Sequence, residues 1–286
     1  MGRLQKITGL VVVSLWAMDA ADATMSYAAR QSGHWLGGGD YVYHNIRGMA
    51  RQWFSEDAQS YDLPPDSLVL EARPLQSAAH SDRALLLWMA NPKRNPRQAG
   101  EVYTCPEYTR GSYYSGPTRV SLVNARTRRI INTLSVADSG GTDSFDIPYL
   151  IRRYYYTVPV LENGSEGKPV VMWLKDYNGD GRAQEFALFD AMACMGLATT
   201  LIGYSEAQDR VIQYPAEIEL IHGAERTTET MYWVDYLFSK KPVRRGYWKY
   251  QIDYRGRDGS LETYEIRYNA RRERFEGTIY ERSPTE

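Results

Sequence analysis

"VNARTRRI" (residues 123–130), "YSEAQDRV" (204–211) and "YNARRERF" (268–275) share one pattern, and that pattern decides the fold. Each segment begins with an apolar or aromatic residue followed by Asn or Ser, and each ends with Arg followed by an apolar residue. Mostly polar residues fill the positions between, which is typical of a turn between two strands. The sequence therefore predicts one β-hairpin repeated three times, in which Arg129, Arg210 and Arg274 begin the return strands.

Another strand-like stretch that ends near a loop lies upstream of each hairpin. The three stretches are "ALLLWMANPKRN" (84–95), "VVMWLKDYNGDG" (170–181) and "YWKYQIDYRGRDG" (247–259). The repeated unit is therefore predicted as strand, loop, strand, hairpin, strand. The segment "EFALFDAMACMGLA" (185–198) also suits a helix through Phe186, Phe189 and Ala193, but its place in the repeat predicts a strand followed by a loop.

These patterns predict a mainly β fold of antiparallel, repeated hairpins. Units that cannot bury both faces of their own sheet stack on one another, so we expect a propeller-like arrangement, with a β-sandwich or an open barrel as the alternative. A short N-terminal helix is expected in "YHNIRGMARQWF" (43–54), where apolar residues form one stripe. The predicted divisions are a signal peptide over 1–23, an N-terminal segment over 24–75 and a β-repeat domain over 76–286.

The N-terminus has the pattern of a cleaved export signal. Arg3 and Lys6 precede the apolar run "ITGLVVVSLWAM", and the small residues Ala21 and Ala23 flank a cleavage position. We therefore expect a secreted or periplasmic protein that has no membrane span after cleavage. A retained anchor or a buried helix is the alternative.

Charge bears on the class of partner, and the cysteines bear on a possible disulfide. The chain carries 34 Lys and Arg against 35 Asp and Glu, a net charge of −1, which does not favour nucleic-acid binding. In an oxidising compartment, Cys105 and Cys194 are expected to form a disulfide. Two separate buried thiols are the alternative.

The stretch "DYNGDGRAQEF" (176–186) is the main candidate for a chemical site. Asp176, Asn178 and Asp180 occupy alternate positions before Gly181. Oxygen ligands at positions one, three and five of a curled loop converge on one point, and the glycine lets the next carbonyl, that of Arg182, turn inward. The spacing predicts a Ca²⁺ site, although "NGDG" is also a strong sequence for a plain hairpin turn.

The same stretch resembles the calcium loops of two families, the EF-hand and the FG-GAP type β-propeller repeat, over about a dozen residues. It departs from the EF-hand at Ala187, where that family has Glu, and from the propeller loop at Gln184, where that family usually has Asp. The resemblance implies a weak, extracellular class of calcium site. Its implied ligands are Asp176, Asn178, Asp180, the Arg182 carbonyl, Gln184 and Glu185, the last directly or through water.

Two functions from different classes remain. The first is an exported calcium-binding module that binds a protein or glycan partner through exposed tyrosines such as those of "EYTRGSYYSGPT" (107–118). The second is a secreted hydrolase that uses a carboxylate pair such as Asp143 and Asp146. Because no established catalytic motif is found in the sequence, the binding module is the favoured hypothesis.

Overall fold

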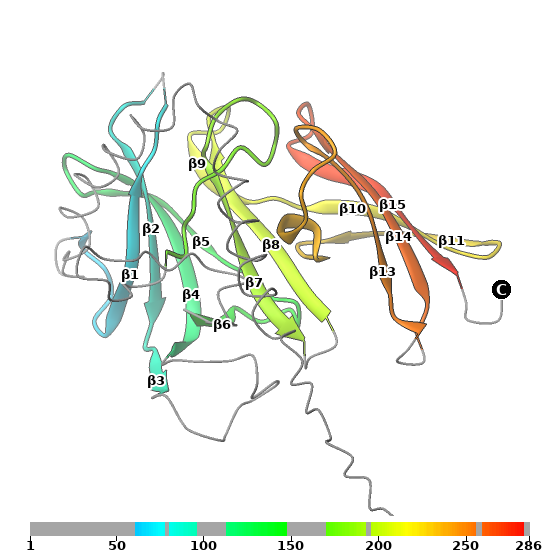
Figure 1. Cartoon of the computed structure of the whole chain (residues 1–286). Coiled ribbons are helices and arrows are strands. Elements are labelled where there is room, and N and C mark those ends of the chain that lie inside the picture. Colours follow the sequence, from blue (N-terminus) through cyan, green and yellow to red (C-terminus); the bar gives the residue numbers. More distant parts are fainter. Residues whose placement is uncertain are drawn as a thin grey trace, which may run out of the picture. The chain divides into compact units, whose positions relative to one another are not determined.

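Three β-sheets hold the described part of the chain together (Figure 1). The structure, a computed structural model, describes residues 61–77, 80–95, 113–147, 170–192, 196–255 and 259–282, all of which lie in the compact unit Trp53–Glu286. The predicted signal peptide, the predicted helix over 43–54 and both cysteines lie outside the described residues.

Each sheet is defined by its strands. Sheet I contains β1 (Ser67–Pro74), β2 (Arg83–Ala90), β3 (Lys93–Asn95), β4 (Tyr113–Asn124), β5 (Ile130–Ser135) and β6 (Ser144–Ile147). Sheet II contains β7 (Glu185–Met192), β8 (Gly196–Ser205), β9 (Arg210–Gln213) and β12 (Val234–Asp235), which is followed by a short 3-10 helix, η2 (Leu237–Ser239). Sheet III contains β10 (Ala216–His222), β11 (Glu225–Met231), β13 (Tyr247–Asp253), β14 (Leu261–Asn269) and β15 (Arg274–Arg282).

Antiparallel pairing dominates these sheets, and the predicted mainly β class is confirmed. Sheet III has the order β11-β10-β15-β14-β13, and its β10 and β15 run parallel. The other pairings of the described strands are antiparallel. Across the described ranges, no helix is long and apolar enough to cross a membrane.

The three predicted hairpins are confirmed as β4–β5, β8–β9 and β14–β15. Strands β9 and β15 begin at Arg210 and Arg274 as predicted, and β5 begins one residue after Arg129. Each sheet therefore contains one copy of the repeated hairpin.

The same residues shape all three turns. The side-chain oxygens of Asn124, Ser205 and Asn269 each accept backbone N–H groups from within the turn, at 2.9 to 3.3 Å. Four residues later the backbone takes a positive φ, at Arg128 (60°), Asp209 (46°) and Glu273 (46°). Local side-chain capping followed by one left-handed residue turns the chain back, so the sequence pattern dictates the turn directly.

The strand that precedes each hairpin was predicted correctly in two of the three copies. β2 pairs with β4, and β13 pairs with β14. In the second copy the prediction of a strand over "VVMWL" is wrong, because β7 (Glu185–Met192) pairs with β8 instead. Val171 and Met172 are buried, but their N–H groups are donated to the Glu71 carboxylate, at 2.8 and 3.2 Å, instead of to a neighbouring strand.

Sheet II is buried on both faces (Figure 1). Its residues Phe186, Leu188, Ile202 and Tyr204 belong to one hydrophobic cluster with Leu85, Leu87, Val120 and Leu122 of sheet I. Its residues Ala187 and Leu201 belong to a second cluster with Trp248, Tyr264, Ile266 and Phe275 of sheet III. Strand β8 is accordingly buried from Leu197 to Ser205, as an apolar strand with both faces covered must be.

Polar contacts link the turns of successive repeats. The Glu273 carboxylate accepts hydrogen bonds from Ser205 Oγ and Gln208 Nε2, both at 2.6 Å. The Asp209 carboxylate accepts two from Arg83, at 3.0 and 2.7 Å. In both cases the residue at the positive-φ position of one hairpin contacts the repeat before it.

Candidate functional site

The predicted calcium loop leads into β7 and is closed at its base by backbone pairing. Lys175 and Glu185 form an isolated β-bridge, in which Lys175 N donates to Glu185 O at 2.8 Å and Glu185 N donates to Lys175 O at 3.2 Å. The intervening loop precedes the first strand of its repeat. The sequence-based equivalence between this loop and "DYRGRDG", which follows β13, is therefore wrong.

Side chains within the loop curl its backbone. The Asp176 carboxylate accepts the N–H groups of Gly179 and Gly181 at 2.7 and 3.0 Å. Asn178 Oδ1 accepts the N–H of Asp180 at 2.9 Å. Gly179 and Gly181 have φ values of 83° and 91°, in the left-handed region that glycine adopts without steric cost. The predicted ligands Asp176, Asn178 and Asp180 thus lie in one short loop whose backbone is held by hydrogen bonds to Asp176 and Asn178.

Glu185 lies at the base of this loop and is fully buried, with an exposed fraction of 0%. Its Oε2 accepts the N–H of Tyr177 at 3.0 Å, and its Oε1 accepts from Asn178 Nδ2 at 3.1 Å. Burial raises the pKa of the Glu185 carboxyl to about 8, and the charges of Asp180 and Asp176 contribute to the rise. The fold therefore disfavours the charged form of this carboxyl.

The structure separates one other predicted ligand, the side chain of Gln184, from this group. Gln184 is buried, and its Nε2 donates to the backbone oxygen of Gln76 at 3.0 Å. Because successive side chains of a strand point to opposite faces, Gln184 faces away from the loop while Glu185 faces it. The predicted ligand of Arg182 is its backbone carbonyl, and its side chain pairs with Glu206. The loop group therefore comprises Asp176, Asn178, Asp180 and Glu185.

Sequence reasoning missed the segment directly before β13, which contacts the loop. Arg245 Nη1 lies 3.9 Å from Asp176 Oδ2. A Cβ added to Gly246 would lie 2.8 Å from the Asn178 carbonyl oxygen, and one added to Gly179 would lie 3.2 Å from Gly246 N. The two glycines allow the backbones to touch. The sole sequence signal for this contact was a glycine directly before a predicted strand.

The donor set is that of a hard cation, although it is not assembled around a single point. In the described part of the chain, no three His, Cys, Asp or Glu side chains converge closely enough to hold a metal ion as they stand. An ion at this loop would therefore draw on Asp176 and Asp180 together with amide and backbone carbonyl oxygens, which are ligands that Ca²⁺ accepts.

Three described residues of the other sequence hypotheses have structural contacts. Asp143 pairs with Arg119 at 2.7 Å and accepts from Ser135 Oγ at 3.2 Å. Asp138 caps its own loop by accepting the N–H groups of residues 140 and 142. Tyr114 packs against the core, and the side chain of Asp146 lies outside the described residues. These contacts give Asp143, Asp138 and Tyr114 structural roles.

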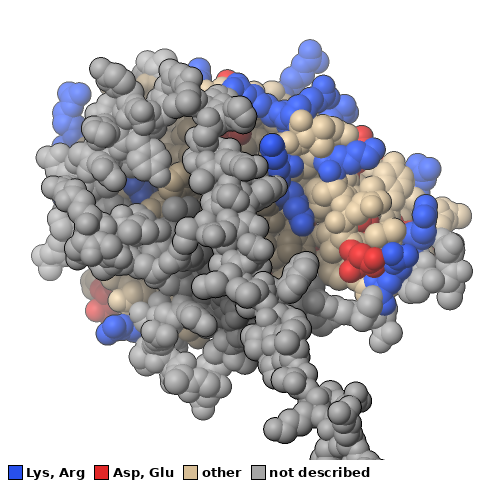
Figure 2. All heavy atoms as spheres, viewed as in Figure 1, with Lys and Arg blue, Asp and Glu red and all other residues tan. Residues whose placement is uncertain are grey.

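Charged side chains on one face of sheet III form ion pairs with one another. Lys249 pairs with Glu265 at 2.9 Å, and Arg274 pairs with Glu217 and Glu276 at 2.5 and 2.8 Å. In Figure 2, acidic side chains lie beside basic ones on this side of the molecule.

Comparisons of the chain with protein-family models, with curated proteins and with solved structures find no match.

Proposed function

We propose that the chain is an exported β-repeat protein that binds Ca²⁺ at residues 176–185 and acts as an interaction module for a protein or glycan partner. The observation that carries the calcium assignment is the loop group itself, in which Asp176, Asn178 and Asp180 curl one loop above the buried Glu185. Export rests on the signal-like pattern of residues 1–23.

Electrostatics favours a cation over an empty turn. Three carboxylates contribute to this loop, and burial together with like charge makes ionisation of Glu185 unfavourable. The guanidinium of Arg245 lies 3.9 Å from Asp176, and the Arg245 side chain is 67% exposed. A carboxylate oxygen that already accepts one N–H keeps a further lone pair for a metal. A divalent cation would therefore relieve repulsion that the turn alone leaves in place.

The propeller-like arrangement is part of the same proposal. Three meanders, β2–β4–β5, β7–β8–β9 and β13–β14–β15, end in equivalent turns, and sheet II packs between the other two sheets. Sheets that stack face to face along the chain are what a blade-like repeat requires.

Thermal unfolding with and without Ca²⁺ tests the proposal. A ligand that binds the native state alone adds about 1.4 kcal/mol at about ten times its Kd, which corresponds to a rise in Tm of a few degrees. Asp180→Asn removes a ligand charge at constant size and should abolish the Ca²⁺-dependent part of the rise. Asp253→Asn is the matched control, because Asp253 also accepts the N–H of the residue two positions on but lies outside the loop.

Two results would contradict the proposal. If chelator-treated protein melts at one temperature with and without millimolar Ca²⁺, and calorimetry detects no heat of binding, the loop is a turn without a metal. A Ca²⁺ response retained in full by Asp180→Asn would place the ion at another part of the chain.

A further inference from the structure

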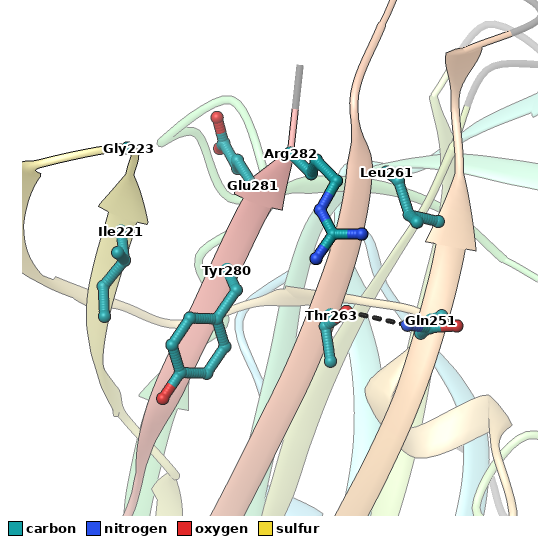
Figure 3. A pocket seen from close by; sticks show the side chains of 8 residues that line it. All are labelled: Ile221, Gly223, Gln251, Leu261, Thr263, Tyr280, Glu281 and Arg282. Carbon is teal, nitrogen blue, oxygen red and sulfur yellow. Dashed lines mark hydrogen bonds between the residues drawn. The ribbon is translucent and has the colours of Figure 1, made fainter. Parts of the chain in front are cut away.

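A row of four side chains crosses the outer face of sheet III. Register pairs Ile221 of β10 with Tyr280 of β15, Tyr280 with Thr263 of β14, and Thr263 with Gln251 of β13 (Figure 3). The opposite face of the same strands packs in the core through residues such as Ile279. Tyr280 is 47% exposed, which makes it one of the large apolar side chains that the described surface presents to water.

A hollow lies along this row. Its lining comprises Ile221, Gly223, Gln251, Leu261, Thr263, Tyr280, Glu281 and Arg282. Gly223, which follows β10, contributes no side chain, and the short Thr263 lies between the longer Tyr280 and Gln251. Figure 3 shows the Arg282 side chain reaching over β14 toward Thr263. The hollow thus has a ring on one side and a guanidinium on another.

The polar groups at the hollow are left with hydrogen-bonding capacity. Within the described residues, neither the Arg282 guanidinium nor the Tyr280 hydroxyl forms an ion pair or a hydrogen bond. Gln251 Nε2 donates to Thr263 Oγ1 at 3.0 Å, so the threonine hydroxyl proton remains to be donated. Lys249 and Arg274 on the same face are, by contrast, paired with carboxylates.

We propose that this hollow binds one acidic sugar residue of a glycan. The sugar ring packs on Tyr280 and Ile221, its carboxylate pairs with Arg282, and a ring hydroxyl accepts from Thr263. A planar guanidinium suits a carboxylate, and an exposed aromatic ring supplies apolar area together with a polar end. The proposal rests on the role as an interaction module and names the class of its partner.

The position of the hollow within the sheet favours a sugar over an extended peptide. A peptide that adds to a sheet pairs its backbone with an edge strand, and the edges of sheet III are β11 and β13. The hollow is centred on β15 and β14, whose backbone groups are already paired on both sides. Recognition here must come from side chains.

Titration with an oligomer of glucuronate, monitored by calorimetry or NMR, tests the proposal. A neutral oligomer of glucose of the same length is the control ligand. The glucuronate oligomer should bind about tenfold more tightly at low salt, because it alone forms the charge-assisted pair with Arg282. Arg282→Gln should remove that difference. Arg267→Gln changes the same charge at an exposed position on the same face and should leave it intact.

A second pair of variants tests the ring. Tyr280→Ala should weaken both oligomers by about tenfold, whereas Tyr232→Ala, at a tyrosine of similar exposure (45%), should weaken neither. Absence of saturable binding by either oligomer, equal affinity for the two, or unchanged binding by Arg282→Gln would overturn the proposal. Tighter binding of an acidic peptide at Arg282 would also overturn it. Because the titration runs in chelator, failure of the calcium site does not affect the result.

Discussion

Gln184 and Glu185 show at the scale of single residues what the sequence could decide about the site. The resemblance to known calcium loops brought both into the predicted ligand set. Which of the two faces the loop depends on where β7 begins and on its pleat, and the structure turns Glu185 toward Asn178 and Gln184 toward Gln76. The curl of the loop backbone around Asp176 was predictable because its contacts are local. The contact between Gly179 and Gly246, which lie 67 residues apart in the sequence, was not predictable.

The buried Glu185 predicts a pH dependence of stability. Its pKa rises from 4.5 to about 8 on folding, chiefly through burial, so the folded state holds a proton that the unfolded state releases. In calcium-free buffer, this group makes the free energy of unfolding fall by about 1.4 kcal/mol per pH unit as the pH rises between these values. Glu185→Gln keeps the size of the side chain and should remove that contribution.

Urea unfolding of wild type and Glu185→Gln at about pH 5, 6 and 7 measures the effect. The variant should gain stability relative to wild type with each step up in pH. Parallel pH profiles for the two proteins would mean that Glu185 is charged in the folded state.

At the scale of elements, the hairpin turns were predictable because their causes are local. A capping Asn or Ser lies four residues before a residue with positive φ in all three copies. The strand predicted over "VVMWL" failed because an apolar run records burial and not a pairing partner. Its N–H groups meet Glu71, about 100 residues earlier, a contact that no local pattern contains.

The link between Asp209 and Arg83 joins the second hairpin to β2, and its strength can be measured. Hydrogen bonds from Arg83 and from Tyr204 lower the pKa of Asp209 to about 2. This stabilisation is complete above the unfolded value of 3.8 and is lost as the pH falls toward 2. Asp209→Asn should lower the free energy of unfolding by about 1 kcal/mol at neutral pH, a value reduced by solvent screening.

Asparagine tolerates the positive φ of 46° at this position, so the substitution tests the charge and adds little backbone strain. Denaturant titrations should show the difference from wild type shrinking at about pH 3. The exposed pair Asp253–Arg255 is the comparison, and Asp253→Asn should leave the unfolding midpoint unchanged. A full-sized loss that persists in acid would assign the effect to packing.

At the scale of the whole molecule, the covering of sheet II on both faces determines how the protein unfolds. Sheets I and III are each in contact with sheet II through one hydrophobic cluster. The sequence contained an indication of this burial in the apolar run of β8, but the order of the layers depends on contacts between distant strands and was beyond local patterns.

Unfolding is therefore expected to be a single transition across sheets I, II and III. Leu188→Ala, toward sheet I, and Leu201→Ala, toward sheet III, each remove a fully buried side chain and should each cost about 2 to 5 kcal/mol. Far-ultraviolet circular dichroism and tryptophan fluorescence should report the same midpoint in both variants. Ile131→Ala, at a side chain 39% exposed, is the control with a small effect. Separate transitions for the two probes would show that the sheets unfold independently.

The central place of β15 in sheet III links maturation of the protein to the direction of its synthesis. The last described strand lies between β10 and β14, so the pair β10–β11 and the pair β13–β14 are joined into one sheet only after residues 274–282 leave the ribosome. Phe275 and Ile279 of β15 belong to the hydrophobic cluster that contains Ala187 and Leu201 of sheet II, so this cluster is incomplete until then. We therefore expect a chain that stops before β15 to expose apolar surface and to aggregate instead of forming a shorter folded protein.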